Sequence, residues 1–453
     1  MTKLFGTDGI RGEAGVFPLD ANTVQVIGAS LARRLRNKLG RSPVVVIGRD
    51  TRESGEWIEQ ALQSGLSSAG AQAKLAGIIT TPGVAYLTRT LPGDAGVVIS
   101  ASHNPYHDNG IKVFTPTGRK LDEETERLIE LDVASRDVTL NVDSPANVTS
   151  SMTPESANLR SQYLDFLANE IGKGLSLKGL RLIVDCANGA ASPFAGELFE
   201  RLGASVTSIN NTPDGRNINR DSGSLHMGGL QHAVVEQNAD LGVAFDGDAD
   251  RSLFVDGRGR LVNGDVTLWV LSKYLKVRGQ LDHNMVVATV MSNIGLELAL
   301  RSENITLRRT DVGDKYVLEE LLSSGAKLGG EQSGHIIFPN LSLAGDGMIT
   351  SLSVLRAMVE ADRPLHELSE GYKNFPQILV NVVVEHKRPF AEVDKIQDAV
   401  HKIETELGTK GRLLLRYSGT EPLARVMIEG ENQEKIEIQA KELSEVIQKA
   451  LGK

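Results

Sequence analysis

The sequence predicts an α/β protein with three related α/β domains and a C-terminal α+β domain. Three stretches, 43–70, 181–204 and 285–302, each contain a short β-branched run, a polar turn and an amphipathic helical pattern in that order. Short apolar runs of this kind are typical of buried strands, and the periodic segments that follow are typical of crossover helices. This alternation favours layers built on parallel sheets.

The C-terminal part of the chain follows a different order. We predict a strand at 378–387, a helix at 393–407, two strands at 412–416 and 424–430, and a closing helix at 434–451. A β-α-β-β-α order with an antiparallel hairpin is typical of an α+β module.

A polar stretch marks the first domain boundary. Residues 135–158 are rich in Ser, Thr, Asn, Val and Asp, which is typical of a linker. Softer boundaries are expected near 257–263 and 371–375. The predicted domains are therefore 1–150, 151–257, 258–371 and 372–453.

Length and composition limit the function classes. The 453 residues suffice for two to four domains. A net charge of −9 without a basic block disfavours nucleic acid and anionic membranes as partners. We expect a soluble cytoplasmic protein. The chain has a single cysteine, Cys186, its N-terminus has no apolar signal segment, and no apolar run reaches the ~18 residues that a membrane helix needs.

A polar loop follows the predicted strand 96–100. Ser102 comes at the carboxyl end of this strand, where α/β sheets bind ligands. His103 and His107 have the spacing of a helical metal pair, but Pro105 between them excludes a helix. On local chemistry alone, a turn serine that bonds its own backbone is the favoured interpretation of Ser102.

Three alternating carboxylates form the second candidate site. Asp246, Asp248 and Asp250 can share one face of an extended segment, and hard oxygen donors suit Mg²⁺, Mn²⁺ or Ca²⁺ better than zinc. An EF-hand is excluded because Arg251 and Gly257 occupy the positions of its Gly and Glu. A polar hairpin loop is the alternative, but three like charges without a cation are unfavourable. Arg251 can neutralise a carboxylate or contact a phosphate.

Two further loops carry weaker signals. Residues 329–335 place Glu331, Ser333 and His335 among glycines, which suits hydroxyl recognition as well as it suits a plain turn. Residues 416–425 combine arginines, hydroxyls and a glycine in a hairpin loop, which is either a phosphate cradle or a solvated tip. The chain has no P-loop, no clean dinucleotide fingerprint and no G-x-S-x-G elbow.

Six motifs in this order, spanning essentially the whole chain, resemble those of the α-D-phosphohexomutase family. They are FGTDGIRG at 5–12, GRDTRESG at 48–55, SASHNP at 100–105, DGDADR at 246–251, GEQSGH at 330–335 and RYSGTEP at 416–422. Within the family, FGTDGIRG, the stretch 99–112, MSNIGLE at 291–297 and Gln332 are most similar to bacterial members that act on glucosamine phosphate. Gluco- and mannomutases more often have TGSHNP and GEMSGH.

The resemblance implies four domains around a central cleft and an isomerase. The reaction would interconvert glucosamine 6-phosphate and glucosamine 1-phosphate, feeding UDP-N-acetylglucosamine and cell-wall precursor synthesis. Ser102 would be a phosphoserine, and glucosamine 1,6-bisphosphate would be the intermediate and activator. Asp246, Asp248 and Asp250, with the phosphate on Ser102, would hold one Mg²⁺ per subunit. The partner would be a phosphosugar. The oligomeric state is left open, with a homodimer as one alternative.

The resemblance also implies roles for other residues. Arg11, Lys112, His335 and Arg251 would surround the reacting phosphoryl group, Glu331 and Ser333 would bind sugar hydroxyls, and the other phosphate would be held by Arg416, Ser418, Gly419, Thr420 and Arg425. Ala249 replaces a usual glycine, for which we expect a small backbone adjustment. Tyr417 replaces a common lysine, which predicts weaker phosphate affinity. A phosphogluco/phosphomannomutase, a metal-dependent serine phosphatase and a non-catalytic sugar-phosphate binder are the alternatives.

Overall fold

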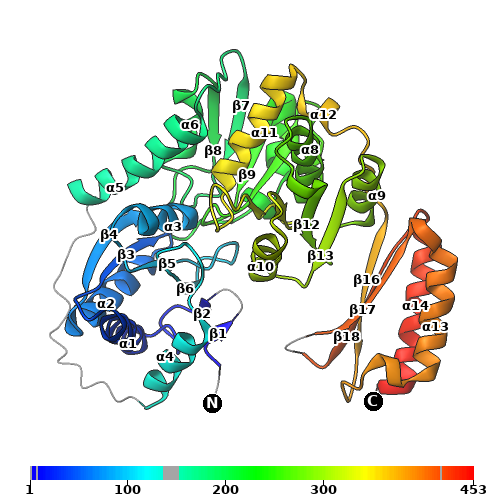
Figure 1. Cartoon of the computed structure of the whole chain (residues 1–453), viewed down its shortest axis with the longest axis horizontal. Helices are drawn as coiled ribbons and strands as arrows, with labels where there is room; N and C mark the ends of the chain where they lie inside the picture. The colour runs from blue at the N-terminus through cyan, green and yellow to red at the C-terminus, as the bar shows by residue number, and fades with distance from the viewer. Residues whose placement is uncertain (1–2, 7–8, 136–152, 419–420, 453) are drawn as a thin grey trace. The chain divides into compact units, whose positions relative to one another are not determined.

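The computed structural model describes residues 3–6, 9–135, 153–418 and 421–452. Contacts divide the chain into two compact units, and each is described by itself. The first unit is Met1–Val290 with Arg308–Glu370, and the second is Met291–Leu307 with Gly371–Lys453. Figure 1 shows the α/β sheets and the separate C-terminal sheet. Residues 136–152, which make up most of the predicted linker, lie outside the described residues.

The first sheet has six strands in the order β1-β2-β6-β5-β3-β4. Strands β3, β4 and β5 are parallel, whereas β6, β2 and β1 extend the sheet in antiparallel pairs. Helices α1 and α2 pack closely at Gly65, which has no Cβ. A Cβ at this position would lie 2.0 Å from the Gln25 carbonyl oxygen. The elements are β1 Phe5–Gly6, β2 Gly9–Glu13, α1 Ala21–Leu39, β3 Val44–Arg49, α2 Gly55–Ser68, β4 Gln72–Ile78, α3 Thr81–Thr90, β5 Ala95–Ile99, β6 Asp108–Phe114 and α4 Glu123–Ser135.

The second sheet has five strands in the order β11-β10-β9-β7-β8. Strands β9 and β10 pair in antiparallel register with Phe245 opposite Ser252, so the residues between them form a hairpin loop. This loop contains the three alternating carboxylates. The elements are α5 Pro154–Asp165, the π-helical turn η1 Phe166–Ile171, β7 Arg181–Asp185, α6 Ala195–Arg201, β8 Ser205–Ile209, η2 Gly223–Leu225, α7 Gly228–Glu236, β9 Leu241–Phe245, β10 Ser252–Asp256 and β11 Leu261–Val262.

The third sheet has four strands in the order β13-β12-β14-β15. Strands β14 and β15 are antiparallel with Gly330 opposite Ile336, and the loop between them carries Glu331, Ser333 and His335. The elements are α8 Gly264–Val277, η3 Asp282–Asn284, β12 Met285–Thr289, α9 Ile294–Ser302, β13 Thr306–Thr310, α10 Asp314–Ser324, β14 Gly329–Gly330, β15 Ile336–Ile337, α11 Gly347–Ala361 and α12 Leu365–Leu368.

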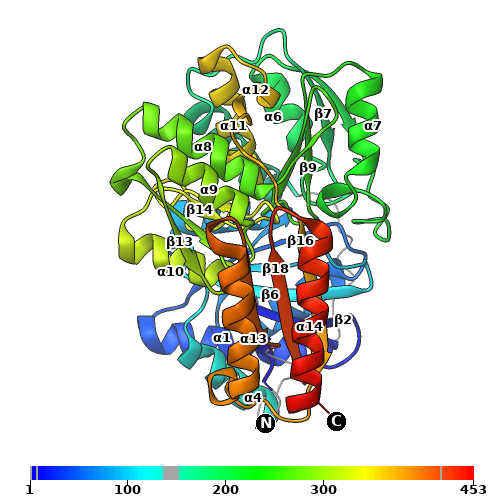
Figure 2. The ribbon, with the colours of Figure 1, turned by 90° about the vertical axis from the view of Figure 1, so that its right-hand side faces the viewer.

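The C-terminal sheet has three antiparallel strands in the order β16-β18-β17. Figure 2 shows α13 and α14 side by side against it. Ile436, Ala440, Leu443 and Ile447 are spaced three or four residues apart, so one face of α14 is buried in the core. The predicted β-α-β-β-α order is confirmed. The elements are β16 Gln377–Val383, η4 Phe390–Glu392, α13 Asp394–Leu407, η5 Gly408–Lys410, β17 Arg412–Tyr417, β18 Leu423–Glu429 and α14 Gln433–Leu451.

Helix α9 belongs to the second unit by its contacts. The buried Glu429 carboxylate accepts hydrogen bonds from Asn293 Nδ2 and the Ile294 N–H, both at 3.2 Å. Arg412 forms an ion pair with the same carboxylate at 2.8 Å. A Cβ at Gly295 would lie 1.9 Å from the Lys373 carbonyl oxygen, so glycine permits this close packing.

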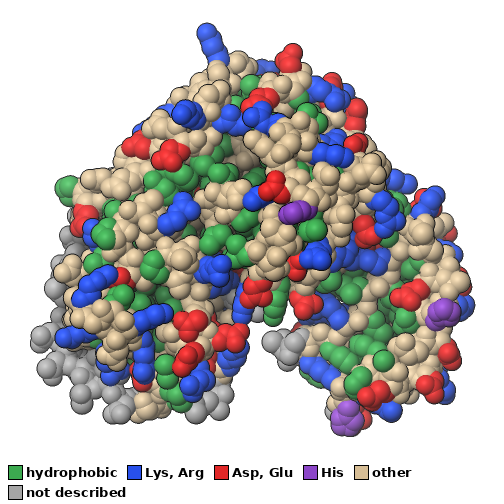
Figure 3. Space-filling model, viewed as in Figure 1, with side chains coloured by type: hydrophobic (Ala, Val, Ile, Leu, Met, Phe, Trp, Pro, Cys, Tyr) green, Lys and Arg blue, Asp and Glu red, His purple; other side chains and the backbone are tan. Residues whose placement is uncertain are grey.

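The surface carries both signs of charge. On the face drawn in Figure 3, Lys and Arg side chains are interspersed with Asp and Glu. In the described part of the chain, the helices lack the combination of length and apolar character that a membrane span requires.

Candidate active site

Ser102 lies just beyond the carboxyl end of β5 in a rare backbone conformation. Its φ is +52°, in the left-handed region that non-glycine residues seldom adopt. Its side chain is buried, and Oγ donates a hydrogen bond to Asp246 Oδ2 at 2.6 Å. The Ser102 N–H donates to Ser100 Oγ at 2.9 Å. A strained backbone that aims a serine oxygen at a carboxylate indicates a functional constraint rather than a free turn.

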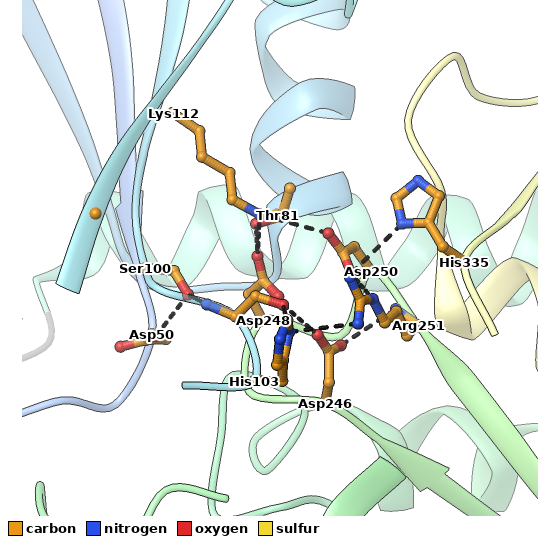
Figure 4. A network of polar contacts seen from close by, with 12 residues as sticks. Asp50, Thr81, Ser100, His103, Lys112, Asp246, Asp248, Asp250, Arg251 and His335 are labelled. Carbon is orange, nitrogen blue, oxygen red and sulfur yellow. Dashed lines mark hydrogen bonds and ion pairs between the residues drawn. The ribbon is translucent and has the colours of Figure 1, made fainter. Parts of the chain in front are cut away.

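The three carboxylates of the β9–β10 loop converge, as their alternation predicted. Ligand atoms of Asp246, Asp248 and Asp250 all lie within 4.8 Å of one another, and all three side chains are buried (Figure 4). The loop approaches Ser102 closely, since a Cβ at Gly247 would lie 2.4 Å from the Ser102 carbonyl oxygen. Glycine at this position therefore brings the carboxylates to the serine.

The electrostatics of this cluster fit a divalent cation. Burial and the charges of Asp250 and Asp248 raise the pKa of Asp246 well above its ordinary value. Asp248 Oδ1 is buried without a hydrogen-bond partner among the described residues, and Asp250 Oδ1 lies 3.5 Å from His335 Nδ1. Since hard, buried oxygens of this kind are the usual ligands of Mg²⁺ and Ca²⁺, the donor set suits such an ion.

Lys112 of β6 contacts two members of the triad. Its Nζ lies 2.9 Å from Asp248 Oδ2 and 3.4 Å from Asp250 Oδ2. Burial opposes the charge on Asp250, but Lys112 and His335 hold its pKa well below the ordinary value. Thr81, at the start of α3, donates to Asp248 Oδ2 at 2.5 Å. The sequence did not single out Thr81, because its contact is formed only when two sheets meet.

His335 lies between two carboxylates. Its Nδ1 is 3.5 Å from Asp250 Oδ1, and its Nε2 is 4.0 Å from Asp314 Oδ2. Burial opposes protonation, but Asp250 and then Asp314 raise the pKa of His335 to about 9. The two carboxylates therefore favour the protonated form of His335.

Arg251 and Arg11 place more positive charge at the same site. The backbone N–H of Arg251 donates to Asp246 Oδ1 at 3.2 Å. Nη1 of the Arg251 guanidinium lies 3.3 Å from His103 Nδ1. Burial, together with the charges of Arg251 and Arg11, lowers the pKa of His103 to about 4. Arg11 reaches this region from β2, where it is paired with Gly110 of β6.

A cavity of about 430 Å³ opens beside these groups in the first unit. Lys112, Asp250 and His335 line it, together with Asp314 and Thr81. Asp314 also pairs with Lys120 at 2.7 Å. The cavity thus places space for a small polar molecule beside Asp250, Lys112 and His335.

The predicted sugar loop is built on a tight turn near Arg251. Ser333 Oγ donates to Glu331 Oε2 at 3.4 Å, and Gly334 has a φ of +91°. A Cβ at Gly264 would lie 2.0 Å from the Glu331 carbonyl oxygen, which shows how closely α8 supports the loop. Against the effect of burial, Asp250, Asp246 and then Glu331 hold the pKa of Arg251 above its ordinary value.

Ala249 adopts a left-handed conformation with a φ of +56° and is fully buried. The backbone adjustment that we expected where Ala249 replaces glycine is therefore this left-handed conformation, which is strained because alanine has a Cβ. Ala249→Gly should raise the free energy of unfolding by about 0.5–1 kcal/mol, because relief of this strain exceeds the entropy that glycine adds to the unfolded chain. Urea unfolding measures the change. Ala244→Gly in β9 is the control and should lose stability; a loss at Ala249 would contradict the argument.

The predicted phosphate loop lies in the second unit. Arg416 of β17 is directly opposite Arg425 of β18, and Arg425 Nη2 lies 3.4 Å from Ser418 Oγ. Two positive charges are thus directly opposite each other beside this loop, and Glu421 Oε2 lies 3.4 Å from Arg425 Nη2. Gly419 and Thr420, which the resemblance assigns to the same site, lie outside the described residues.

Tyr417 does not leave the loop short of cations. Its ring stacks on Phe390 at 4.1 Å between centroids, and its hydroxyl donates to the Arg388 carbonyl oxygen. Lys387 reaches the loop from another segment, and its Nζ donates to the Ser418 carbonyl oxygen at 2.5 Å. A lysine from outside the motif thus contacts the backbone of the loop, and the expectation of weaker phosphate affinity stays a prediction.

Comparisons with known proteins agree over the whole chain. Profiles of the phosphoglucomutase/phosphomannomutase family match domain I at residues 2–139, domain II at 161–259, domain III at 263–375 and the C-terminal domain at 379–446. Phosphoglucosamine mutase of Solibacter usitatus is 49% identical over 449 residues, covering 99% of each chain. Phosphoglucosamine mutase of Clostridium acetobutylicum is 47% identical over 451 residues, again covering 99% of each.

Solved structures show the same fold. A phosphoglucomutase/phosphomannomutase family protein from Burkholderia thailandensis has a TM-score of 0.78 at 24% identity and covers 99% of this chain and 97% of its own. N-acetylphosphoglucosamine mutase of Aspergillus fumigatus has a TM-score of 0.66 at 19% identity and covers 99% and 96%. The profile matches, the full-length relatives and the shared fold lead to one conclusion: this chain belongs to the phosphoglucomutase/phosphomannomutase family and is an isomerase.

Proposed function

We propose that this chain interconverts glucosamine 6-phosphate and glucosamine 1-phosphate through a phosphoserine at Ser102. The observation that carries the proposal is the serine oxygen 2.6 Å from Asp246, a member of a buried acidic triad whose other carboxylates contact Lys112 and His335. A serine hydroxyl is a weak nucleophile alone, but a phosphorylated serine is a covalent phosphoryl carrier. The full-length relatives named phosphoglucosamine mutase support this choice of sugar.

The reaction would consist of two opposite transfers. In the first, the bond between phosphorus and Ser102 Oγ breaks, and a bond forms to O1 of glucosamine 6-phosphate. In the second, the bond between phosphorus and O6 of the bisphosphate breaks, and the phosphoryl group returns to Ser102. In each transfer the oxygen that leaves phosphorus, first Ser102 Oγ and then O6, gains a proton, and the attacking oxygen, first O1 and then Ser102 Oγ, loses one. We assign both exchanges to His335, which borders the cavity and would donate its proton to the leaving oxygen and take up the proton of the attacking oxygen.

The other residues of the site would position and neutralise charge. Asp246, Asp248 and Asp250, with the serine phosphate, would hold one Mg²⁺ per subunit, which neutralises negative charge on the transferred group. Lys112, Arg251 and Arg11 supply fixed cations for the same purpose, and phosphoryl transfer depends mainly on such positioning and neutralisation. Glu331 and Ser333 would bind sugar hydroxyls.

The opposed arginines of the second unit would hold the phosphate that is not reacting. Arg416, Ser418 and Arg425 form this clamp, with Gly419 and Thr420 proposed as further ligands. The clamp must accept both isomers, which favours guanidinium forks over a pocket shaped for one sugar orientation.

Arg416→Ala should raise KM for both phosphate isomers alike. Loss of one charge-assisted contact costs about 1.5–3 kcal/mol, which corresponds to a roughly 10- to 150-fold rise. Steady-state kinetics in both directions measure the effect, and Arg388→Ala, which removes an exposed arginine paired with Glu392, is the control. A fall in kcat with KM unchanged would assign Arg416 to another role.

Substrate choice tests the proposed function directly. Glucosamine phosphate should be turned over with a higher kcat/KM than glucose or mannose phosphate, with weak activity on glucose phosphate. Gln332→Met should narrow this preference, because Gln332 lies in the loop with Glu331 and Ser333. Equal or better efficiency with glucose or mannose phosphate would favour a phosphogluco/phosphomannomutase. Net phosphate release would instead indicate a metal-dependent serine phosphatase. Binding of the sugar phosphate without turnover would indicate a non-catalytic sugar-phosphate binder.

We further propose glucosamine 1,6-bisphosphate as the activator and a cytoplasmic location. The domain boundaries proposed from the sequence are 1–150, 151–257, 258–371 and 372–453. The net charge of −9 supports a small-molecule phosphosugar partner rather than a nucleic acid or an anionic membrane.

A further inference from the structure

Arg52 is a fully buried arginine whose side chain meets the Ser102 loop. It follows β3 by three residues, and its guanidinium is shielded from solvent. Nη2 donates to the Ser102 and Asn104 carbonyl oxygens at 3.0 and 2.8 Å. Nη1 donates to the Asp108 carbonyl oxygen at 2.9 Å and to the Pro105 carbonyl oxygen.

The last N–H of the guanidinium is also committed. Arg52 Nε donates to Asp50 Oδ2 at 2.9 Å. An arginine has five N–H donors, and all five therefore have acceptors that belong to the protein. Arginines beside phosphoserines commonly bind the phosphate, but this one has no donor left to offer.

Asp50 connects Arg52 to the amide of Ser102. Asp50 Oδ2 also accepts a hydrogen bond from Ser100 Oγ at 2.6 Å (Figure 4), and Ser100 Oγ in turn accepts from the Ser102 N–H at 2.9 Å. The peptide groups on both sides of Ser102 are thus held by one network. Because these contacts act on the main chain, they fix its left-handed conformation.

Asn219 supports the same carbonyl groups from the second sheet. It follows β8, and its Nδ2 donates to the Ser102 and Asn104 carbonyl oxygens at 2.9 and 3.1 Å. The loop is therefore held between donors from two domains. Asn219 duplicates two of the four carbonyl contacts of Arg52, so its loss should have a smaller effect.

We propose, on the basis of the phosphoserine mechanism above, that Arg52 is a positioning residue for phosphoryl transfer. It aims the Ser102 oxygen at the triad in both the free and the phosphorylated enzyme. Its contacts among the described residues go to main-chain carbonyls and Asp50, whereas phosphorylation changes only the Ser102 side chain. Displacement of a reacting atom by about 1 Å can cost roughly 100-fold in rate.

The test is Arg52→Lys in the full chain, assayed with saturating Mg²⁺. Lysine keeps the charge but has three donors without the planar fork, so it cannot hold four carbonyls and Asp50 together. We expect kcat to fall about 100-fold while KM for the sugar phosphate stays within about threefold. Asn219→Ala leaves Arg52 in place and should lower kcat about tenfold. This second variant tests the same loop even where Arg52→Lys does not fold.

The matched control is Arg49→Lys. Arg49 is the last residue of β3, three residues before Arg52, its side chain is 11% exposed, and it pairs with Glu59 at 3.5 Å. Its replacement should lower Tm but leave kcat within about twofold. An equal loss of kcat in the Arg49 variant would show that the Arg52 effect is merely structural and would overturn the proposal.

A spectroscopic readout separates positioning from phosphate binding. The ³¹P resonance of the phosphorylated wild type should be a single narrow line, and in Arg52→Lys it should broaden or split because the loop samples several conformations. A raised KM with an unchanged ³¹P line would make Arg52 a substrate ligand and contradict the proposal. All ratios are taken on whichever sugar phosphate the wild type turns over, so a wrong sugar assignment does not affect this test.

Discussion

Ser102→Ala should abolish turnover and leave the fold intact. The variant cannot carry a phosphoryl group, and a phosphohexomutase that works through a phosphoserine has no second carrier to replace it. The loss in kcat should therefore exceed about 1,000-fold, larger than that of any positioning residue. Steady-state assays and intact mass measure it: the wild type should contain a fraction with one added phosphate, and the variant should contain none.

A matched control separates this chemical loss from the loss of a buried hydrogen bond. Ser30 is fully buried in the same domain and donates to Asp132 Oδ2 at 2.6 Å, the distance that separates Ser102 Oγ from Asp246 Oδ2. Ser30→Ala should cost about 1 kcal/mol of stability and keep normal kcat. Substantial activity in Ser102→Ala would refute the phosphoserine mechanism.

The sequence predicted the contacts that arise within one segment. Asp246, Asp248 and Asp250 converge because a short hairpin between antiparallel strands places alternate residues together, and this alternation is visible in the chain. Ser102 stands at the end of a buried strand for a similarly local reason. The β-α-β-β-α order of the C-terminal part was also readable, because helical and strand periods differ clearly there.

Contacts between distant segments could not be read in this way. Arg52 follows β3 and looks like a residue of an exposed turn, yet β3 and β5 are parallel neighbours, so their carboxyl ends bring it to Ser102. Lys387 contacts the Ser418 carbonyl oxygen from outside the phosphate motif. Helix α9 follows the third βα pattern but packs on the C-terminal unit, because Glu429 binds its N-terminus. The adjacency of parallel strand ends is the signal that could have indicated Arg52.

Removal of the metal should abolish activity as well, and Asp248→Asn should make the enzyme depend on much more Mg²⁺. Buried carboxylates repel one another, and a divalent ion offsets this repulsion only while the negative charges remain. Replacement of the middle ligand removes one charge and leaves an amide that binds a hard cation weakly. In Asp248→Asn, we expect the Mg²⁺ concentration for half-maximal activity to rise at least about 100-fold. In the wild type, we expect EDTA to abolish activity.

Thermal unfolding provides a readout that does not depend on turnover. An ion that binds only the folded protein at 100 times its Kd adds about 2.7 kcal/mol of stability, so Mg²⁺ should raise the Tm of the wild type. At the same concentration it should leave Asp248→Asn nearly unchanged. Asp256→Asn removes a buried carboxylate from β10 of the same sheet, where it pairs with Arg260 at 2.8 Å, and should lower Tm without altering the Mg²⁺ response. Full activity of the wild type in chelator, or an Asp248→Asn variant with the wild-type Mg²⁺ response, would exclude the triad as the metal site.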